Sequence, residues 1–358
     1  MNKQNLNDFC GIGKRIDNPN KHNWESLSLD NLKFERPTVL CLSGDGTVTF
    51  EDANGYAKIA ENYLQLLFKA KDPKTGEIVK PTDKVDILSV KYANNILSQE
   101  AKQQIVNCIF ALLVDENGNR LELEQAKKNM SQLTFFTFCY GHSCLFNIIQ
   151  KVNVRLQSAG YVENEISAIN NACFELCYGH ISGVNNIPSV RIHSKEDETF
   201  FTEAPLYNGT SWKYLDGILL RKNEPGNLNG LSGCVNATAP SIQIESSKLI
   251  NLHLEELDEH GVEAIKLNKD FNLEPYIDAE TGVAYSSPNA KCVAQMAAWA
   301  LCKGVENSVQ NFESDKYVPN TYYNDLMGDF KSIMDSFKQR ELLKDYGKKQ
   351  NQDLGIER

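Results

Sequence analysis

The residues from Leu133 to Gln150, LTFFTFCYGHSCLFNIIQ, constrain the fold more than any other stretch of the chain. Their first part is a short run of apolar and aromatic residues, a composition typical of a buried strand. Gly141, His142 and Ser143 follow, and apolar residues then recur with the spacing of one helix face. The pattern predicts a buried strand, a sharp turn at 141–143 and an amphipathic helix over 144–158.

The segments around this stretch alternate between strand and helix patterns. Short apolar runs predict strands at 37–43, 85–92, 188–193 and 249–254. Helical spacing predicts helices at 53–67, 98–110, 121–130, 163–177 and 289–309. This alternation indicates an α/β fold with a mostly parallel sheet that carries helices on both faces.

Three further segments have little or no strand–helix alternation. Residues 1–36 are polar and aperiodic, so we expect an irregular N-terminal arm before a domain over 37–310. Residues 203–247 are rich in glycine and proline, which predicts an irregular insertion or cap with at most one strand near 214–220. Residues 311–358 are charged and helical in pattern, and we expect a C-terminal tail that offers a surface to a protein partner.

The overall composition excludes several classes of partner. The chain carries 37 basic and 47 acidic residues, and no basic cluster suggests nucleic-acid binding. It contains neither an apolar run of the roughly 18 residues that span a bilayer nor the apolar core of a secretory signal. Ten cysteines lie mostly in apolar segments without C-x-x-C spacing, which favours free thiols in a reducing compartment. We expect a cytoplasmic location, although a protein exported by a signal-independent system has the same features.

The strand, Gly141-His142-Ser143 and the helix together resemble the nucleophile elbow of the α/β-hydrolase superfamily. In that motif, G-x-S-x-G, the serine sits on a strained strand-to-helix turn above the sheet. Here the motif reads Gly141-His142-Ser143-Cys144-Leu145, with leucine in place of the second glycine. The resemblance implies an α/β-hydrolase-like fold and a serine esterase or lipase in which Ser143 attacks a lipid or small acyl ester without a cofactor or metal.

The same resemblance implies a catalytic triad in the chain order serine, acid, histidine. His260 follows a predicted strand in an acidic loop, where a base reaches the carboxyl edge of the sheet. Asp197 follows the predicted strand 188–193 and is the first choice for the acid, with Glu196 and Glu224 as alternatives. We therefore expect Ser143, His260 and Asp197 to form the triad.

The oxyanion hole and the substrate contacts follow from the same resemblance. One oxyanion N–H is expected from Cys144 and one from the loop that contains Gly44, while Asp45 and His142 are expected to contact substrate. The insertion would cap the site and set acyl specificity. Many Asn, Lys and Ile residues fit a bacterial source, and a divergent member of the effector type is compatible with the sequence.

Other interpretations of these segments stay open. Gly44-Asp45-Gly46-Thr47 also resembles the phosphate loop of lipid and NAD kinases and the D-x-D-G-T motif of haloacid-dehalogenase-like phosphatases, which implies magnesium-dependent phosphoryl transfer. In the phosphatase motif, Ser43 replaces the nucleophilic aspartate.

Two further alternatives concern the central motif. The chain could be a non-catalytic scaffold that binds a protein partner, and Cys144 is an alternative nucleophile beside Ser143. The near-repeat Leu176-Cys-Tyr-Gly-His-Ile181 is expected to end a helix at Gly179.

Overall fold

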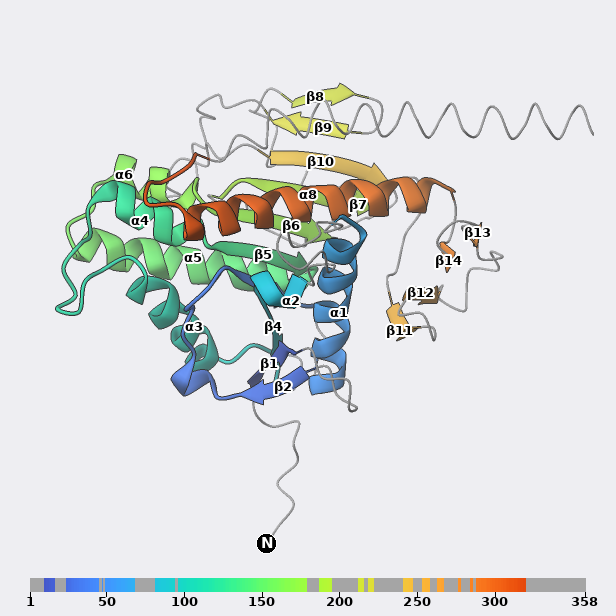
Figure 1. Cartoon of the computed structure of the whole chain (residues 1–358), viewed down its shortest axis with the longest axis horizontal. Coiled ribbons are helices and arrows are strands. Elements are labelled where there is room, and N and C mark those ends of the chain that lie inside the picture. Colours follow the sequence, from blue (N-terminus) through green and yellow to red (C-terminus); the bar gives the residue numbers. More distant parts are fainter. Residues whose placement is uncertain are drawn as a thin grey trace, which may run out of the picture.

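The structure is a computed structural model, and it describes the core of the chain together with several separate strands. The described residues are 10–16, 24–44, 47, 49–67, 81–93, 96–178, 187–194, 212–215, 218–221, 241–246, 253–257, 263–266, 276–277, 284–285 and 288–319. Figure 1 shows the arrangement of these elements around one large sheet.

Six parallel strands form the centre of the sheet, in the spatial order β4-β3-β5-β6-β7-β10. They are β3 (Thr38–Leu42), β4 (Asp86–Lys91), β5 (Leu133–Phe138), β6 (Phe174–Tyr178), β7 (Ser189–Ser194) and β10 (Ser241–Ser246). Every residue of β3 is buried, as expected for a strand that is covered on both faces. The predicted α/β class and mostly parallel sheet are therefore confirmed.

Antiparallel strands extend this sheet at both edges to ten strands. β1 (Gly11–Arg15) pairs with β4 and with β2 (Trp24–Leu27), so the expectation of an irregular arm over 1–36 is wrong for these residues. β8 (Trp212–Leu215) and β9 (Ile218–Arg221) form a hairpin beside β10. The segment 203–247 thus holds three strands where at most one was predicted, because edge pairing supplies order that local periodicity does not show.

A second, small sheet has the order β11-β12-β14-β13. Its strands are β11 (His253–Leu257), β12 (Glu263–Lys266), β13 (Tyr276–Ile277) and β14 (Ala284–Tyr285). β11 overlaps the end of the strand predicted at 249–254, whose first residues lie outside the described part of the chain.

Helices cover the two faces of the large sheet. One face carries α1 (Phe50–Leu67) and α8 (Pro288–Glu313), which contact each other and the strands (Figure 1). The core on the other face includes residues of α3 (Gln99–Ala111), α4 (Leu123–Met130), α5 (Tyr140–Ser158) and α6 (Glu163–Asn170). Two short helices, α2 (Pro81–Lys84) and the 3-10 turn η2 (Leu29–Asn31), complete the set.

Strand β5 shows how alternate side chains reach the two layers. Phe135 packs in the core that α5 shares, whereas the Phe136 ring lies 6.3 Å from the ring of Tyr63 in α1. The hydroxyl of Thr134 lies 3.1 Å from that of Ser308 in α8. Thr137 therefore belongs, by the period of two, on the α5 face.

The helix predicted over 163–177 is wrong in its second half. α6 ends at Asn170, and residues 174–178 form β6 between β5 and β7. The central place in the sheet buries both faces of this segment, and that burial outweighs its helical spacing. Cys177 therefore lies on a strand, and the expected helix end at Gly179 lies outside the described residues.

The expected C-terminal helical tail lies mostly outside the described residues, which end at 319. Residues 314–319 are not helical. Among the helices that the structure describes, none combines the length and apolar character needed to cross a membrane.

Candidate functional site

The junction of β5 and α5 is a one-residue turn at Cys139. Its φ of 50° and ψ of −118° make it the one residue other than glycine with positive φ in the described part of the chain. Such backbone is costly for a residue with a side chain and is concentrated at functional sites. The turn predicted at 141–143 is therefore wrong in position: the chain reverses at Cys139, and 141–143 belong to the first turn of α5.

Gly141 lets this first turn of α5 lie directly against the end of β3. A Cβ built on Gly141 would overlap the carbonyl group of Leu42 and come within 2.8 Å of the Ser43 carbonyl oxygen. A residue without a side chain is needed here because backbone meets backbone. Gly141, two residues after Cys139, thus allows the close packing of α5 against β3 that the turn at Cys139 requires.

The loop after β3 reaches the same turn. A Cβ on Gly44 would lie 3.2 Å from the Phe138 ring and 3.4 Å from Cβ of Cys139. The Tyr92 hydroxyl donates to the Ser43 carbonyl at 2.5 Å, and the Thr47 hydroxyl donates to the Gly44 carbonyl at 2.9 Å. These bonds hold the loop at the turn, while Asp45, the predicted substrate contact, lies outside the described residues.

The start of α5 supplies backbone donors next to Cys139. The first four N–H groups of a helix have no partner four residues back, and they lie at the positive end of its dipole. Tyr140 is the first residue of α5, whereas Cys144 is the fifth. The N–H of Cys144, the predicted oxyanion donor, therefore belongs to the regular helix ladder, whereas the N–H of Tyr140 lies at the open start of the helix.

A buried polar cluster lies under the first turn of α5. His142 Nδ1 lies 2.8 Å from Glu175 Oε1, and the Thr137 hydroxyl donates to the same oxygen at 2.6 Å. Cys177 completes the cluster, since ligand atoms of His142, Glu175 and Cys177 all lie within 4.8 Å of one another. His142 and Glu175 have no exposed surface, and Cys177 is also fully buried.

This environment determines the charge of His142. Burial alone would lower the pKa of the imidazole, but the negative charge of Glu175, followed by the interaction with Cys177, raises it to about 10. The pairing with Glu175 therefore favours the protonated form of the imidazole.

The structure describes only some of the residues that the sequence predicted for the site. Ser143 is half-buried in α5 and its carbonyl accepts a hydrogen bond from the Asn147 amide at 2.8 Å. His142, predicted to contact substrate, faces Glu175 in the interior. His260, Asp197 and the alternative acids Glu196 and Glu224 lie outside the described residues.

Three residues of the site were missed in the sequence. The spacing of the G-x-S-x-G motif is also met by Thr137, Cys139 and Gly141, with a small residue first, a potential nucleophile in the middle and glycine last. This alternative begins one residue before the end of the strand. That register is a signal for Cys139. Glu175 and Cys177 were hidden by the helical spacing of 163–177, although a carboxylate in so apolar a run was a signal of a buried partner.

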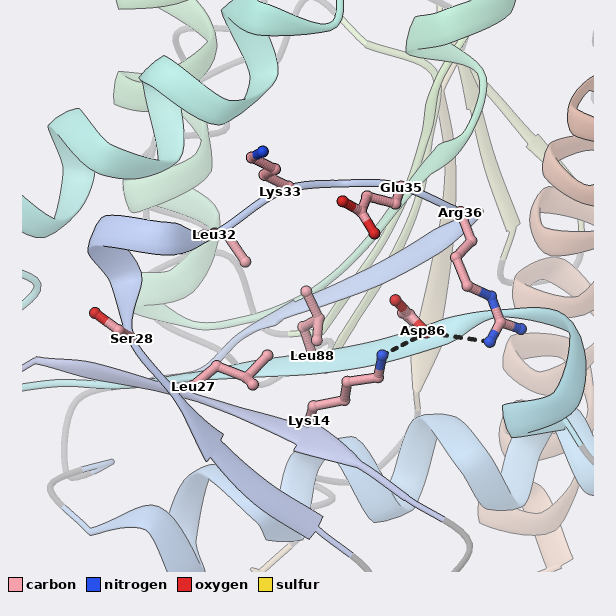
Figure 2. Close-up of a pocket in the computed structure, with 9 residues that line it drawn as sticks. All are labelled: Lys14, Leu27, Ser28, Leu32, Lys33, Glu35, Arg36, Asp86 and Leu88. Atoms are coloured by element: carbon pink, nitrogen blue, oxygen red, sulfur yellow. Dashed lines mark ion pairs between the residues drawn. The ribbon is translucent and has the colours of Figure 1, made fainter.

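A pocket of about 310 Å³ lies at the amino-terminal end of the parallel strands, opposite the end that carries Cys139 (Figure 2). Asp86, the first residue of β4, contacts Lys14 at 3.0 Å and Arg36 at 3.6 Å on its rim. Ligands of parallel sheets bind beyond the carboxyl ends of the strands, whereas this pocket lies at the amino ends of β3 and β4. The turn at Cys139 is therefore the better candidate for chemistry.

Comparison with models of known protein families finds no family that matches the chain, and comparison with curated proteins finds no similar sequence.

Proposed function

We propose that the chain is an acyl hydrolase of the α/β-hydrolase type, with the thiol of Cys139 as its nucleophile. The observation that carries the proposal is the positive φ of Cys139 between a central parallel strand and a helix. A nucleophile on such a turn projects away from the strand toward the substrate. Cys139 is partly exposed, which fits a reacting thiol.

The neighbouring loop supports the same class. In α/β-hydrolases one oxyanion donor comes from the residue after the nucleophile and one from the loop after the third strand. Here Tyr140 follows Cys139, and the loop at Gly44 lies in contact distance of Cys139. The order β4-β3-β5-β6-β7-β10, with an antiparallel pair beyond β4, places the turn after a central strand.

The reaction follows from these groups. The sulfur of Cys139 bonds to the ester carbonyl carbon, and its proton passes through a base to the departing alkoxide. The N–H of Tyr140 and the loop at Gly44 stabilise the oxyanion, aided by the positive end of α5. Water then hydrolyses the thioester to release the acid and restore the thiol. His260 and Asp197 remain the predicted base and acid, and a lipid or small acyl ester the predicted substrate.

Cys139 is favoured over Ser143 by position. Ser143 lies four residues further along, about 6 Å up the helix axis at 1.5 Å per residue. It stands on regular helix and lacks the backbone strain that projects a nucleophile from the sheet.

Nitrophenyl ester hydrolysis by Cys139→Ala and Ser143→Ala tests the proposal. We expect the first variant to lose about 10³-fold or more in kcat/KM, because loss of a nucleophile typically removes at least that much. The second variant should stay close to the wild type. Iodoacetamide should label Cys139, and Cys139→Ser should place a fluorophosphonate label on residue 139.

Three results would contradict the assignment. Fluorophosphonate labelling of Ser143 in the wild type, lost in His260→Ala, would make Ser143 the nucleophile. Folded wild type that hydrolyses no acyl ester and whose Cys139 resists alkylation would favour the non-catalytic scaffold. Stimulation by magnesium and a nucleotide would favour phosphoryl transfer at the Gly44-Asp45-Gly46-Thr47 loop.

A further inference from the structure

We propose that His142, Glu175 and Cys177 form a zinc site beneath the first turn of α5. The proposal is independent of the nucleophile assigned above, because Cys139 is not one of the three ligands. Imidazole nitrogen, carboxylate oxygen and thiolate sulfur are the three donor types that zinc accepts in proteins. The cluster offers one of each.

The donor atoms are already close to the required spacing. Zinc bonds of about 2.0–2.3 Å place tetrahedral ligand atoms about 3.3–3.8 Å apart. The three donors lie within 4.8 Å of one another, and His142 Nδ1 and Glu175 Oε1 are separated by 2.8 Å. Side-chain adjustments of an ångström or less therefore reach coordination geometry. Three protein ligands leave a fourth position for a water molecule.

The backbone that carries these ligands is regular. Glu175 and Cys177 are two residues apart on β6, so both side chains point to the α5 face, where His142 lies. Thr137 of β5 is the register neighbour of Cys177, and its hydroxyl already orients the Glu175 carboxylate. A hydrogen-bonded partner behind a ligand is a common feature of metal sites.

Charge in the interior favours a divalent ion at this place. Zinc with a thiolate, a carboxylate and a neutral imidazole has a total charge of zero. Buried charges are tolerated where they are compensated, and the cluster has no exposed surface. The soft thiolate and the imidazole favour zinc over magnesium or calcium, which prefer sites built entirely of oxygen ligands.

The direct test is the metal content of the purified full-length chain. We expect about one zinc ion per wild-type chain by elemental mass spectrometry after dialysis, as for a three-ligand site. Cys177→Ser and His142→Gln should retain less than about a tenth of it, since each removes a ligand. Cys173→Ala is the matched control, because Cys173 is equally buried near β6 but lies outside the cluster. Cys139→Ala should also keep its zinc.

A measurement on the wild type avoids variants that fail to fold. Cobalt added after chelation should give a thiolate-to-cobalt absorption band, and zinc should slow alkylation of Cys177 relative to the chelated chain. Absence of zinc from the folded wild type, together with no cobalt band and no protection of Cys177, would overturn the site. Loss of zinc from Cys173→Ala as well as Cys177→Ser would also count against it, since it would point to a nonspecific effect of unfolding.

Discussion

The same four residues, Cys-Tyr-Gly-His, occur twice in this chain, and the two cysteines have different backbone structures. After Phe138 the cysteine makes the strained turn into α5, whereas after Leu176 the cysteine lies within β6. The register explains the difference: Thr137 pairs with Cys177 and Phe138 with Tyr178, so β6 continues through a cysteine and β5 stops before one. Local sequence therefore does not decide which cysteine leaves the sheet. The pairing of neighbouring strands does.

The two cysteines consequently have different chemical environments. Cys139 is partly exposed beside Gly44 and the start of α5. Cys177 is fully buried beside an imidazole and a carboxylate. The first environment suits a nucleophile and the second suits a ligand.

The largest expected effect is the difference in ester hydrolysis between substitutions of Cys139 and of Cys177. Cys139→Ala should lower kcat/KM for an acyl ester by about 10³-fold or more, because it removes the nucleophile. Cys177→Ala should stay within about tenfold, because Cys177 is buried in the cluster with His142 and Glu175 and is not the proposed nucleophile. Initial rates on a nitrophenyl ester measure both. Equal losses of kcat/KM in the two folded variants would show that Cys139 and Cys177 do not differ in the way proposed.

The next effect concerns the buried pair of His142 and Glu175 beneath the turn at Cys139. Glu175→Gln leaves the buried His142 without its carboxylate, and breaking a buried pair costs about 3–5 kcal/mol in the free energy of unfolding. Glu165→Gln is the control, because its pair with Arg120 is solvent-accessible and such pairs contribute about 1 kcal/mol or less. Urea unfolding of both variants measures the difference. Similar losses would mean that the cluster under α5 does not stabilise the fold.

The third effect tests the close approach of α5 to β3. Gly141→Ala would force a methyl group against the Leu42 carbonyl, and overpacking of this kind costs about 1–3 kcal/mol or more. Gly55→Ala in α1 is the control, since nothing lies within 4 Å of its added Cβ, and it should stabilise the chain by up to about 1 kcal/mol. Thermal unfolding distinguishes the two. A neutral Gly141→Ala would indicate that α5 can shift away from β3.

A fourth effect is the pH dependence of stability in the chelated protein. The pKa of His142 is raised from about 6.5 to about 10 in the folded chain, so folding favours the imidazolium. This contribution is fully present below pH 6.5 and is lost as the pH rises toward 10. Urea midpoints measured across this range should fall with pH, and the slope should diminish in Glu175→Gln. A wild-type midpoint that is constant over the range would contradict the pairing.

Much of the fold was predictable because its elements are locally encoded. The buried strands at 38–42 and 86–91 and the helix over 50–67 follow directly from apolar runs and helical spacing. Ser98 caps α3 with a 3.1 Å bond to the N–H of Ala101, as its place before the helix suggests. The strand and helix around the central motif were also correct, although the turn between them was not.

The remaining features depend on long-range packing. Residues 11–15 become a strand only because the edge of β4 is available to pair with them, and residues 24–27 pair in turn with that strand. Residues 174–178 become a strand because β5 and β7 lie on either side. Periodicity within one segment contains no information about such neighbours, so the sequence alone favoured an irregular arm and a helix.

The sequence by itself determined the alternation of strands and helices and placed cysteine and serine side chains near the end of β5. Only the tertiary structure decided that the chain turns at Cys139, because the contacts of Gly141 with Leu42 and of Gly44 with the turn set where α5 begins. It also brought His142, Glu175 and Cys177 together from two elements. Backbone contacts between distant segments fixed these positions, and no local pattern encodes contacts of that kind.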